Sequence, residues 1–168
     1  MKCIIDTNVP CMANSADPTD MTELEVNCAI RCSDFIKKFI DDKSSKLVVD
    51  QGREIVGEYE KNISQTGQPG MANLFLDWVY QYLCRMAVED FIYINKTSEN
   101  EYEEFPNHKG LKGFDPADRK FVAVAHAHPH HPVIIQGTDS KWWRFKEVLK
   151  ACGIEIHFID EEYMKSKI

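Results

Sequence analysis

The chain has 168 residues, with 27 Asp and Glu against 20 Lys and Arg, a formal net charge of -7 and 43% hydrophobic residues. This length suits one domain, and the composition is that of a globular protein, which excludes a disordered or collagen-like chain. The negative charge argues against a protein that coats nucleic acid through excess positive charge. It does not exclude a metal-dependent enzyme of nucleic acids, because the active site of such an enzyme itself uses carboxylates.

The apolar segments of the sequence are short. The longest are residues 3–5, 121–125 and 133–135, far below the roughly 20 residues of a membrane span. Asp6 interrupts the N-terminal apolar run too early for a signal peptide. The six cysteines form neither a disulfide framework nor a paired zinc motif. We therefore expect a soluble, cytoplasmic protein with reduced thiols and no membrane partner.

Short apolar runs alternate with amphipathic segments along the chain. Helical spacing of apolar residues, a threonine N-cap at Thr22 and a proline at Pro116 predict helices at residues 22–42, 52–64, 71–87, 116–127 and 142–152. Strands are predicted at residues 2–6, 47–50, 91–94, 133–136 and 154–159. Residues 8–20, 65–70, 96–113 and 128–132 are predicted as loops or turns. This order predicts one α/β domain over residues 1–168, a three-layer α/β/α sandwich with a mainly parallel sheet.

Acidic residues follow the ends of the predicted strands, where such sheets bind ligands. Asp6 ends the first strand, Asp139 follows the strand at 133–136, and Asp118 lies in the first turn of the helix opened by Pro116. Glu54 and Glu58 share one helical face, and either is a candidate fourth acid. One such acid alone is usually a cap or turn residue. Four converging carboxylates would repel one another, and Mg²⁺ or Mn²⁺ would remove that repulsion.

Four segments resemble, in order, the motifs of PIN-domain proteins over roughly residues 2–160. They are residues 4–9 (IIDTNV), 54–59 (EIVGEY), 118–125 (DRKFVAVA) and 138–142 (TDSKW). The resemblance places the second acid at Glu58, with Glu54 as its rival. It places the third at Asp118, with Asp115 as its rival, although Asp115 before Pro116 suits an N-cap. The chain departs from the family at Gly137, where members often carry threonine, and at Lys141, where many carry a further acid.

The resemblance implies a metal-dependent endoribonuclease. Asp6, Glu58, Asp118 and Asp139 would be both catalytic residues and ligands of one or two Mg²⁺ or Mn²⁺ ions. The metal would activate a water for in-line attack and stabilise charge on the phosphate, leaving a 5′-phosphate and a 3′-hydroxyl. Thr7, Asn8 and Thr138 would orient a ligand carboxylate or a water.

Three cations close to these motifs are candidate RNA contacts: Lys112, Arg119 and Lys141. RNA is the expected substrate, and the protein is either the toxin of a toxin–antitoxin pair, with an antitoxin protein as partner, or an RNA-processing enzyme. A second copy of the chain, forming a homodimer, is a further candidate partner.

Two other function classes stay open. One is a PIN-fold module that binds without catalysis, which the departures at Gly137 and Lys141 favour. The other is a haloacid-dehalogenase-like phosphatase, although such enzymes require a second aspartate where this chain has Asn8. The histidines at residues 126–131 are either a zinc or nickel site or, as Pro129 and Pro132 favour, a solvated turn.

Overall fold

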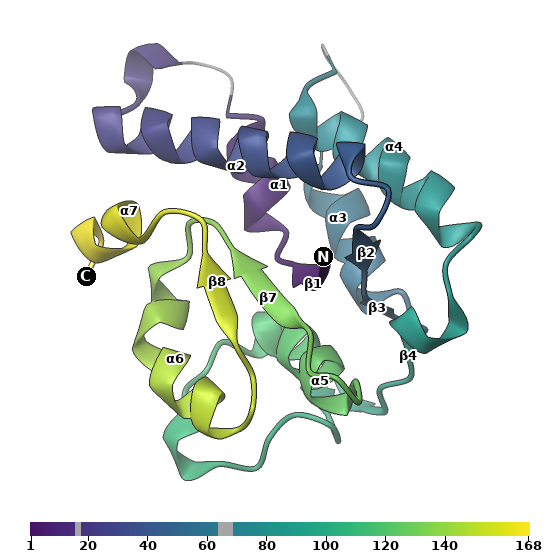
Figure 1. Ribbon diagram of the computed structural model, residues 1–168. Helices are drawn as coiled ribbons and strands as arrows, with labels where there is room; N and C mark the ends of the chain where they lie inside the picture. Colours follow the sequence, from purple (N-terminus) through teal and green to yellow (C-terminus); the bar gives the residue numbers. More distant parts are fainter. Residues whose placement is uncertain (16–17, 64–68) are drawn as a thin grey trace.

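The computed structural model describes residues 1–15, 18–63 and 69–168 and contains a central sheet of four parallel strands (Figure 1). The strands run in the order β2-β1-β7-β8: β1 (Lys2–Ile5), β2 (Lys46–Leu47), β7 (Val133–Gln136) and β8 (Ile156–Phe158). In the register, Cys3 of β1 lies between Leu47 and Val133. The prediction of a mixed α/β protein with a parallel sheet is therefore confirmed.

Two further strand pairs lie outside this sheet. β3 (Val49–Asp50) pairs in parallel with β4 (Phe91–Ile92). β5 (Lys96–Ser98) pairs with β6 (Glu101–Tyr102) in an antiparallel hairpin. The strand predicted at 47–50 is thus divided between two sheets, because the chain changes partner at Val48, whose N–H donates to the Cys3 carbonyl.

The described part of the chain forms seven α-helices and four 3₁₀ turns. The helices are α1 (Asn8–Ala13), α2 (Glu23–Asp41), α3 (Glu54–Asn62), α4 (Met71–Leu83), α5 (Arg119–Ala127), α6 (Ser140–Ala151) and α7 (Glu161–Ser166). The 3₁₀ turns are η1 (Pro18–Asp20), η2 (Val88–Asp90), η3 (Lys109–Leu111) and η4 (Pro116–Asp118). In Figure 1, α1 and α2 lie above the sheet and α5 lies below it.

The longest helix, α2, forms for reasons visible in its sequence. Thr22 and Glu25 form a reciprocal capping box at its start, which satisfies two backbone N–H groups that the first turn leaves unpaired. Cys28, Cys32 and Ile36 then recur every fourth residue and are fully buried against the core. The two thiols therefore act as small apolar side chains, and all six cysteines are free.

Parallel pairing brings the carboxyl ends of β1 and β7 to the same edge of the sheet. The Asp6 N–H donates to the Ile135 carbonyl, so the segments that follow the two strands begin side by side. Residues 6–8 leave β1 at this edge, and residues 137–139 leave β7. Chain order alone predicts this meeting point, and the candidate functional site lies here.

The prediction of a loop over residues 8–20 is wrong for its first half. Residues 8–13 form α1, because Pro10 stands in the first turn, where its missing N–H costs nothing. The Asp6 carboxylate accepts the Asn8 N–H at 2.9 Å and so starts this helix. Residues 16 and 17 of the predicted loop lie outside the described residues.

The loop predicted over residues 96–113 is also partly wrong, since it contains the β5–β6 hairpin and η3. Asn100 adopts a positive φ of 59° in the turn, which asparagine tolerates better than most residues. The helix α7, at 161–166, was not predicted; Asp160 caps it, and Tyr163 and Met164 are buried. The turn predicted at 65–70 lies mostly outside the described residues.

Within the described ranges, none of the helices has the length and apolar character needed to cross a bilayer.

Candidate functional site

A cavity of about 320 Å³ lies at the edge where β1 and β7 end. It is lined by Asp6, Thr7, Asn8, Cys11, Glu58, Asn62, Asp118 and Asp139. The four acids that the sequence predicts as site residues therefore meet in one pocket, which we call the carboxylate pocket. They come from the end of β1, from α3, from η4 and from the segment after β7.

Asp6 is the most deeply placed acid of the pocket. Its side-chain Oδ1 accepts the Asn8 N–H, whereas Oδ2 is buried without a hydrogen-bond partner among the described residues. Burial raises the pKa of Asp6 well above its ordinary value, and the negative charges of Asp118, Glu58 and Asp139 raise it further. Burying a carboxylate whose second oxygen has no hydrogen-bond partner costs free energy, unless a cation or a proton compensates the charge.

Asp118 has a similar environment on the other side of the pocket. The indole Nε1 of Trp142 donates to its Oδ2 at 3.0 Å. Burial, followed by the charges of Asp139 and Asp115, raises the pKa of Asp118 to about 7. Trp142 is a fully buried side chain, and its hydrogen bond to Asp118 was not predicted from the sequence. Its position three residues after Asp139, one helical turn away, was the available signal.

Asp139 and Asn8 fix the backbone at the rim of the pocket. Asp139 caps α6, because its Oδ1 accepts the Lys141 N–H at 2.8 Å. The Asn8 Oδ1 accepts the N–H groups of Gly137 at 2.8 Å and Thr138 at 3.2 Å. A Cβ at residue 137 would lie only 2.8 Å from the Asn8 Oδ1 and 3.3 Å from the Val9 Cα. The close approach of α1 thus explains the glycine at this position.

Glu58 differs from the three aspartates, because it is already neutralised. Its carboxylate pairs with the Nζ of Lys120, which also donates to the Ala117 carbonyl. Lys120 is 5% exposed, an unusual burial for lysine. The sequence did not predict its pairing with Glu58; the available signal was the place of Lys120 beside the apolar stretch at 121–125.

The two rival acids lie outside the pocket. Glu54 is held by the Lys96 Nζ at 2.9 and 3.0 Å and by the Tyr102 hydroxyl at 3.2 Å. Asp115 accepts the Ala117 N–H at 3.1 Å and pairs with Lys141 at 2.9 Å. The prediction that Asp115 is an N-cap is confirmed.

The three cations predicted to contact substrate do not line the carboxylate pocket. Lys112 is exposed. Arg119 pairs with Glu101 and lies over the Phe105 ring at 5.2 Å, while Lys141 is held by Asp115. Of the residues predicted to orient ligands, Thr7 and Asn8 line the pocket and Thr138 contacts it through Asn8. The buried Thr7 hydroxyl has no partner within the described ranges.

The carboxylate oxygens of the pocket suit a hard cation, but the side chains lie too far apart to bind one as they stand. Across residues 1–15, 18–63 and 69–168, no group of three or more His, Cys, Asp and Glu side chains stands ready to hold a metal ion. Carboxylates that repel one another spread apart, and a divalent cation would draw them together. Such a cation would bind the unpaired oxygen of Asp6. It would also stabilise the ionised forms of Asp6 and Asp118, whose pKa values are raised.

Comparisons of the chain with protein-family models, curated proteins and solved structures give no match.

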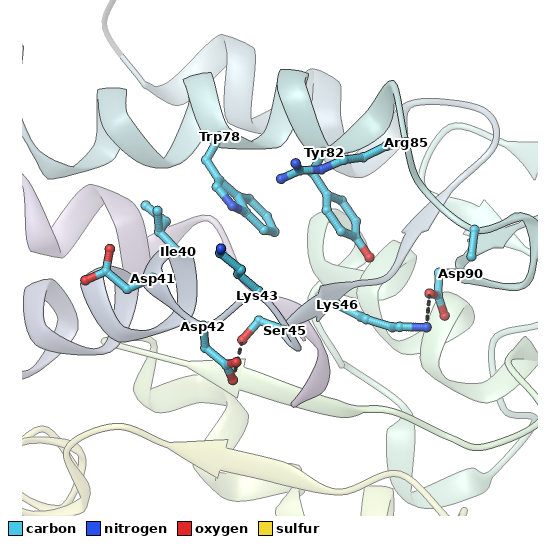
Figure 2. Close-up of a pocket in the computed structure, with 11 residues that line it drawn as sticks. Ile40, Asp41, Asp42, Lys43, Ser45, Lys46, Trp78, Tyr82, Arg85 and Asp90 are labelled. Atoms are coloured by element: carbon cyan, nitrogen blue, oxygen red, sulfur yellow. Dashed lines mark hydrogen bonds and ion pairs between the residues drawn. The ribbon is translucent and has the colours of Figure 1, made fainter.

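A larger cavity, of about 640 Å³, lies at the opposite, amino-terminal end of β2 (Figure 2). Trp78 and Tyr82 form one wall, and Lys43, Lys46 and Arg85 bring positive charge (Figure 2). Its buried acid, Asp90, lies 3.9 Å from Lys46 and is also paired with Lys2. Because this carboxylate already has cationic partners, Asp90 is not an uncompensated buried acid of the kind that Asp6 is in the carboxylate pocket.

Proposed function

We propose that this chain is a metal-dependent endoribonuclease with a PIN-like, three-layer α/β/α fold. One observation carries the proposal: three aspartates from three distant segments each have one oxygen held by a protein donor. The donors are the Asn8 N–H on Asp6, the Trp142 indole on Asp118 and the Lys141 N–H on Asp139. The second oxygen of each aspartate is then left to bind another group at the same pocket.

The order of the strands supports the same fold and site. Asp6 and Asp139 follow neighbouring parallel strands, with helices above and below the sheet in Figure 1. Asp118 joins them from the start of α5, which packs against β7. These acids meet at the carboxyl edge of the sheet, where α/β proteins bind their ligands.

Asp6, Asp118 and Asp139 would hold Mg²⁺ or Mn²⁺, with Glu58 as the fourth carboxylate of the pocket. A bound ion of this kind supplies an acidified water and stabilises negative charge on a phosphodiester. The chain itself orients the aspartates through the three donors above. Asn8 ties α1 to residues 137 and 138, which fixes the spacing between the two strand ends.

RNA contact would be local, because the chain carries a net charge of -7 and long-range attraction to phosphate is absent. Of the three predicted contacts, Lys112 is exposed without an ion-pair partner within the described ranges, whereas Arg119 and Lys141 already have partners. A toxin with an antitoxin partner, an RNA-processing enzyme and a homodimer all remain compatible with this arrangement.

The test combines metal binding with cleavage. Saturating Mn²⁺ should raise the melting temperature of the wild type by about 5 to 10 °C, and the protein should cleave a single-stranded or structured RNA pool. Asp6→Asn and Asp118→Asn should lose both effects yet remain folded. The exposed Asp77→Asn on α4 serves as the matched control and should behave like the wild type. Absence of cleavage at millimolar Mn²⁺ would refute the nuclease proposal.

The Lys120–Glu58 pair favours one alternative, a non-catalytic binding module, because it removes one acid from the metal-binding set. In that case Mn²⁺ would stabilise the wild type without RNA cleavage, or would not stabilise it at all. A phosphatase of the haloacid-dehalogenase type is disfavoured, since the position that needs its second aspartate holds Asn8, which is bonded to the 137–138 backbone.

A further inference from the structure

Lys120 places a positive charge against one acid of the carboxylate pocket, Glu58. It follows Asp118 by two residues, at the start of α5, and its ammonium group contacts Glu58 across from α3. Its side chain is only 7% exposed, against 22% for Glu58. A lysine that stays buried retains its charge only when a carboxylate compensates it, so the two residues form one unit.

Local contacts hold the ammonium group in place. It donates to the Ala117 carbonyl and lies 5.2 Å from the centre of the Phe121 ring. On the other side, the Tyr59 hydroxyl donates to the Ile5 carbonyl and anchors α3 to the end of β1. Glu58 precedes Tyr59, so its backbone position is fixed relative to Asp6 and Lys120.

The pairing of Lys120 with Glu58 then limits the number of metal ions. The carboxylate pocket has four acids, and Lys120 occupies the carboxylate of one of them, Glu58. The remaining ligands are the three aspartates, each with one oxygen already held by a protein donor. Their three other oxygens suffice for one divalent ion, which keeps water ligands as well, whereas a second ion would need the Glu58 carboxylate and would lie beside the buried ammonium group of Lys120.

We propose that Lys120 supplies the charge that a second metal ion would otherwise provide, so that the pocket binds one divalent ion through Asp6, Asp118 and Asp139. This inference rests on the proposed metal-dependent function. Glu58, which the sequence predicts as a fourth ligand, instead serves as the partner of Lys120.

The experiment counts Mn²⁺ ions per folded chain by electron paramagnetic resonance and equilibrium titration, without RNA. The wild type should bind one ion, and Lys120→Met should bind two, because Glu58 then gains a free carboxylate. Lys120→Arg keeps the charge and should bind one ion. Lys150→Met removes an exposed lysine from α6 and is the matched control, with one ion expected.

The double variant Lys120→Met/Glu58→Gln shows whether Glu58 is a metal ligand or the ion-pair partner of Lys120. It should bind one ion with an affinity within about threefold of the wild type, since neither removed group contacts that ion. If Lys120→Met does not fold, the number of Mn²⁺ ions on the wild type and on this double variant tests the inference. If Glu58 is a ligand, the double variant weakens Mn²⁺ binding by about tenfold or more.

Each outcome has a distinct meaning. Two ions on the wild type, or one ion on folded Lys120→Met, would overturn the inference and leave the nuclease proposal intact. No Mn²⁺ binding to the wild type would instead remove the proposed function, and the inference with it. One ion on the wild type and two on Lys120→Met would establish the role of Lys120.

Discussion

Asp115 and Asp118 stand three residues apart, and their surroundings shift their pKa values in opposite directions. Lys141 and the Ala117 N–H lower the pKa of Asp115. Burial and the charge of Asp139 raise the pKa of Asp118 from 3.8 to about 7. The fold therefore stabilises the ionised form of Asp115, whereas the surroundings of Asp118 oppose its ionisation.

The sign of the pH dependence follows from the Asp118 shift. Well below pH 4, Asp118 is protonated in both folded and unfolded chains. As the pH rises towards 7, the unfolded chain ionises first, so the metal-free fold loses stability through this window. We expect the ionisation of Asp118 to lower the free energy of unfolding by on the order of 2 kcal/mol between pH 4 and pH 7. Asp118→Asn should flatten that change in urea unfolding with a chelator present.

Asp115→Asn is the comparison for this experiment. Because its pKa is lowered in the folded chain, ionised Asp115 stabilises the fold at pH values above the ordinary pKa of aspartate, and this stabilisation is lost as the pH falls. The substitution should therefore destabilise the fold near neutral pH. A parallel loss in both variants at pH 7 would contradict the opposite shifts.

At the scale of elements, helices were predictable where a cap and an apolar stripe agree. Both signals exist for α2, and its predicted bounds of 22–42 differ from the observed Glu23–Asp41 by one residue at each end. For α1, Pro10 and Asn14 suggest a loop in isolation, and only the contacts with α2 and Asp6 make a short helix stable. Local sequence cannot supply tertiary contacts of this kind.

The site shows the same division. The meeting of Asp6 and Asp139 was predictable, because parallel strands place their carboxyl ends together, and Asp118 was predictable from its place at a helix start facing that edge. The contacts of Lys120 with Glu58 and of Trp142 with Asp118 were not predictable, since lysine in a helix is usually exposed and an indole is usually apolar core. Their roles depend on side-chain contacts between segments that only the folded chain brings together.

The capping box of α2 gives a prediction at this scale. Thr22 Oγ1 accepts the Glu25 N–H at 3.3 Å, and the Glu25 carboxylate accepts the Thr22 N–H at 2.9 Å. Thr22→Ala removes the first contact, and also the hydrogen bond that the Thr22 hydroxyl donates to the Glu25 carboxylate at 2.9 Å. It should lower the free energy of unfolding by about 1 kcal/mol in urea titration. Thr22→Ser keeps the hydroxyl and should stay close to the wild type. Equal losses in both variants would show that the methyl group, and not the cap, matters.

Across the whole molecule, one buried acid ties together segments that are distant in sequence. Asp90 is fully buried and pairs with Lys2 of β1 and, at 3.9 Å, with Lys46 of β2. His128, also fully buried, lies 3.7 Å from it. The expectation of a solvated turn at 126–131 is therefore wrong for His128, although no metal-binding histidine group occurs among the described residues. Burial and the charge of Lys2 lower the pKa of His128.

Removing the charge of Asp90 should weaken the whole fold, because it leaves Lys2 without its buried partner. Asp90→Asn preserves the side-chain volume and should lower the free energy of unfolding by about 2 kcal/mol in urea titration. This is less than the loss for a fully enclosed pair, since Lys2 and Lys46 retain 27% and 45% side-chain exposure. The exposed Asp77→Asn should change stability by less than about 0.5 kcal/mol.

A second substitution distinguishes lost pairing from lost packing. If the uncompensated lysine causes the destabilisation, adding Lys2→Met to Asp90→Asn should recover part of the loss, because an apolar side chain needs no counter-charge. Additive losses in the double variant would mean that each side chain stabilises the fold independently. The Mn²⁺-induced stabilisation should persist in Asp90→Asn, in Lys2→Met and in the double variant, because the Asp90 cluster lies at the amino-terminal end of the sheet and the carboxylate pocket at the other.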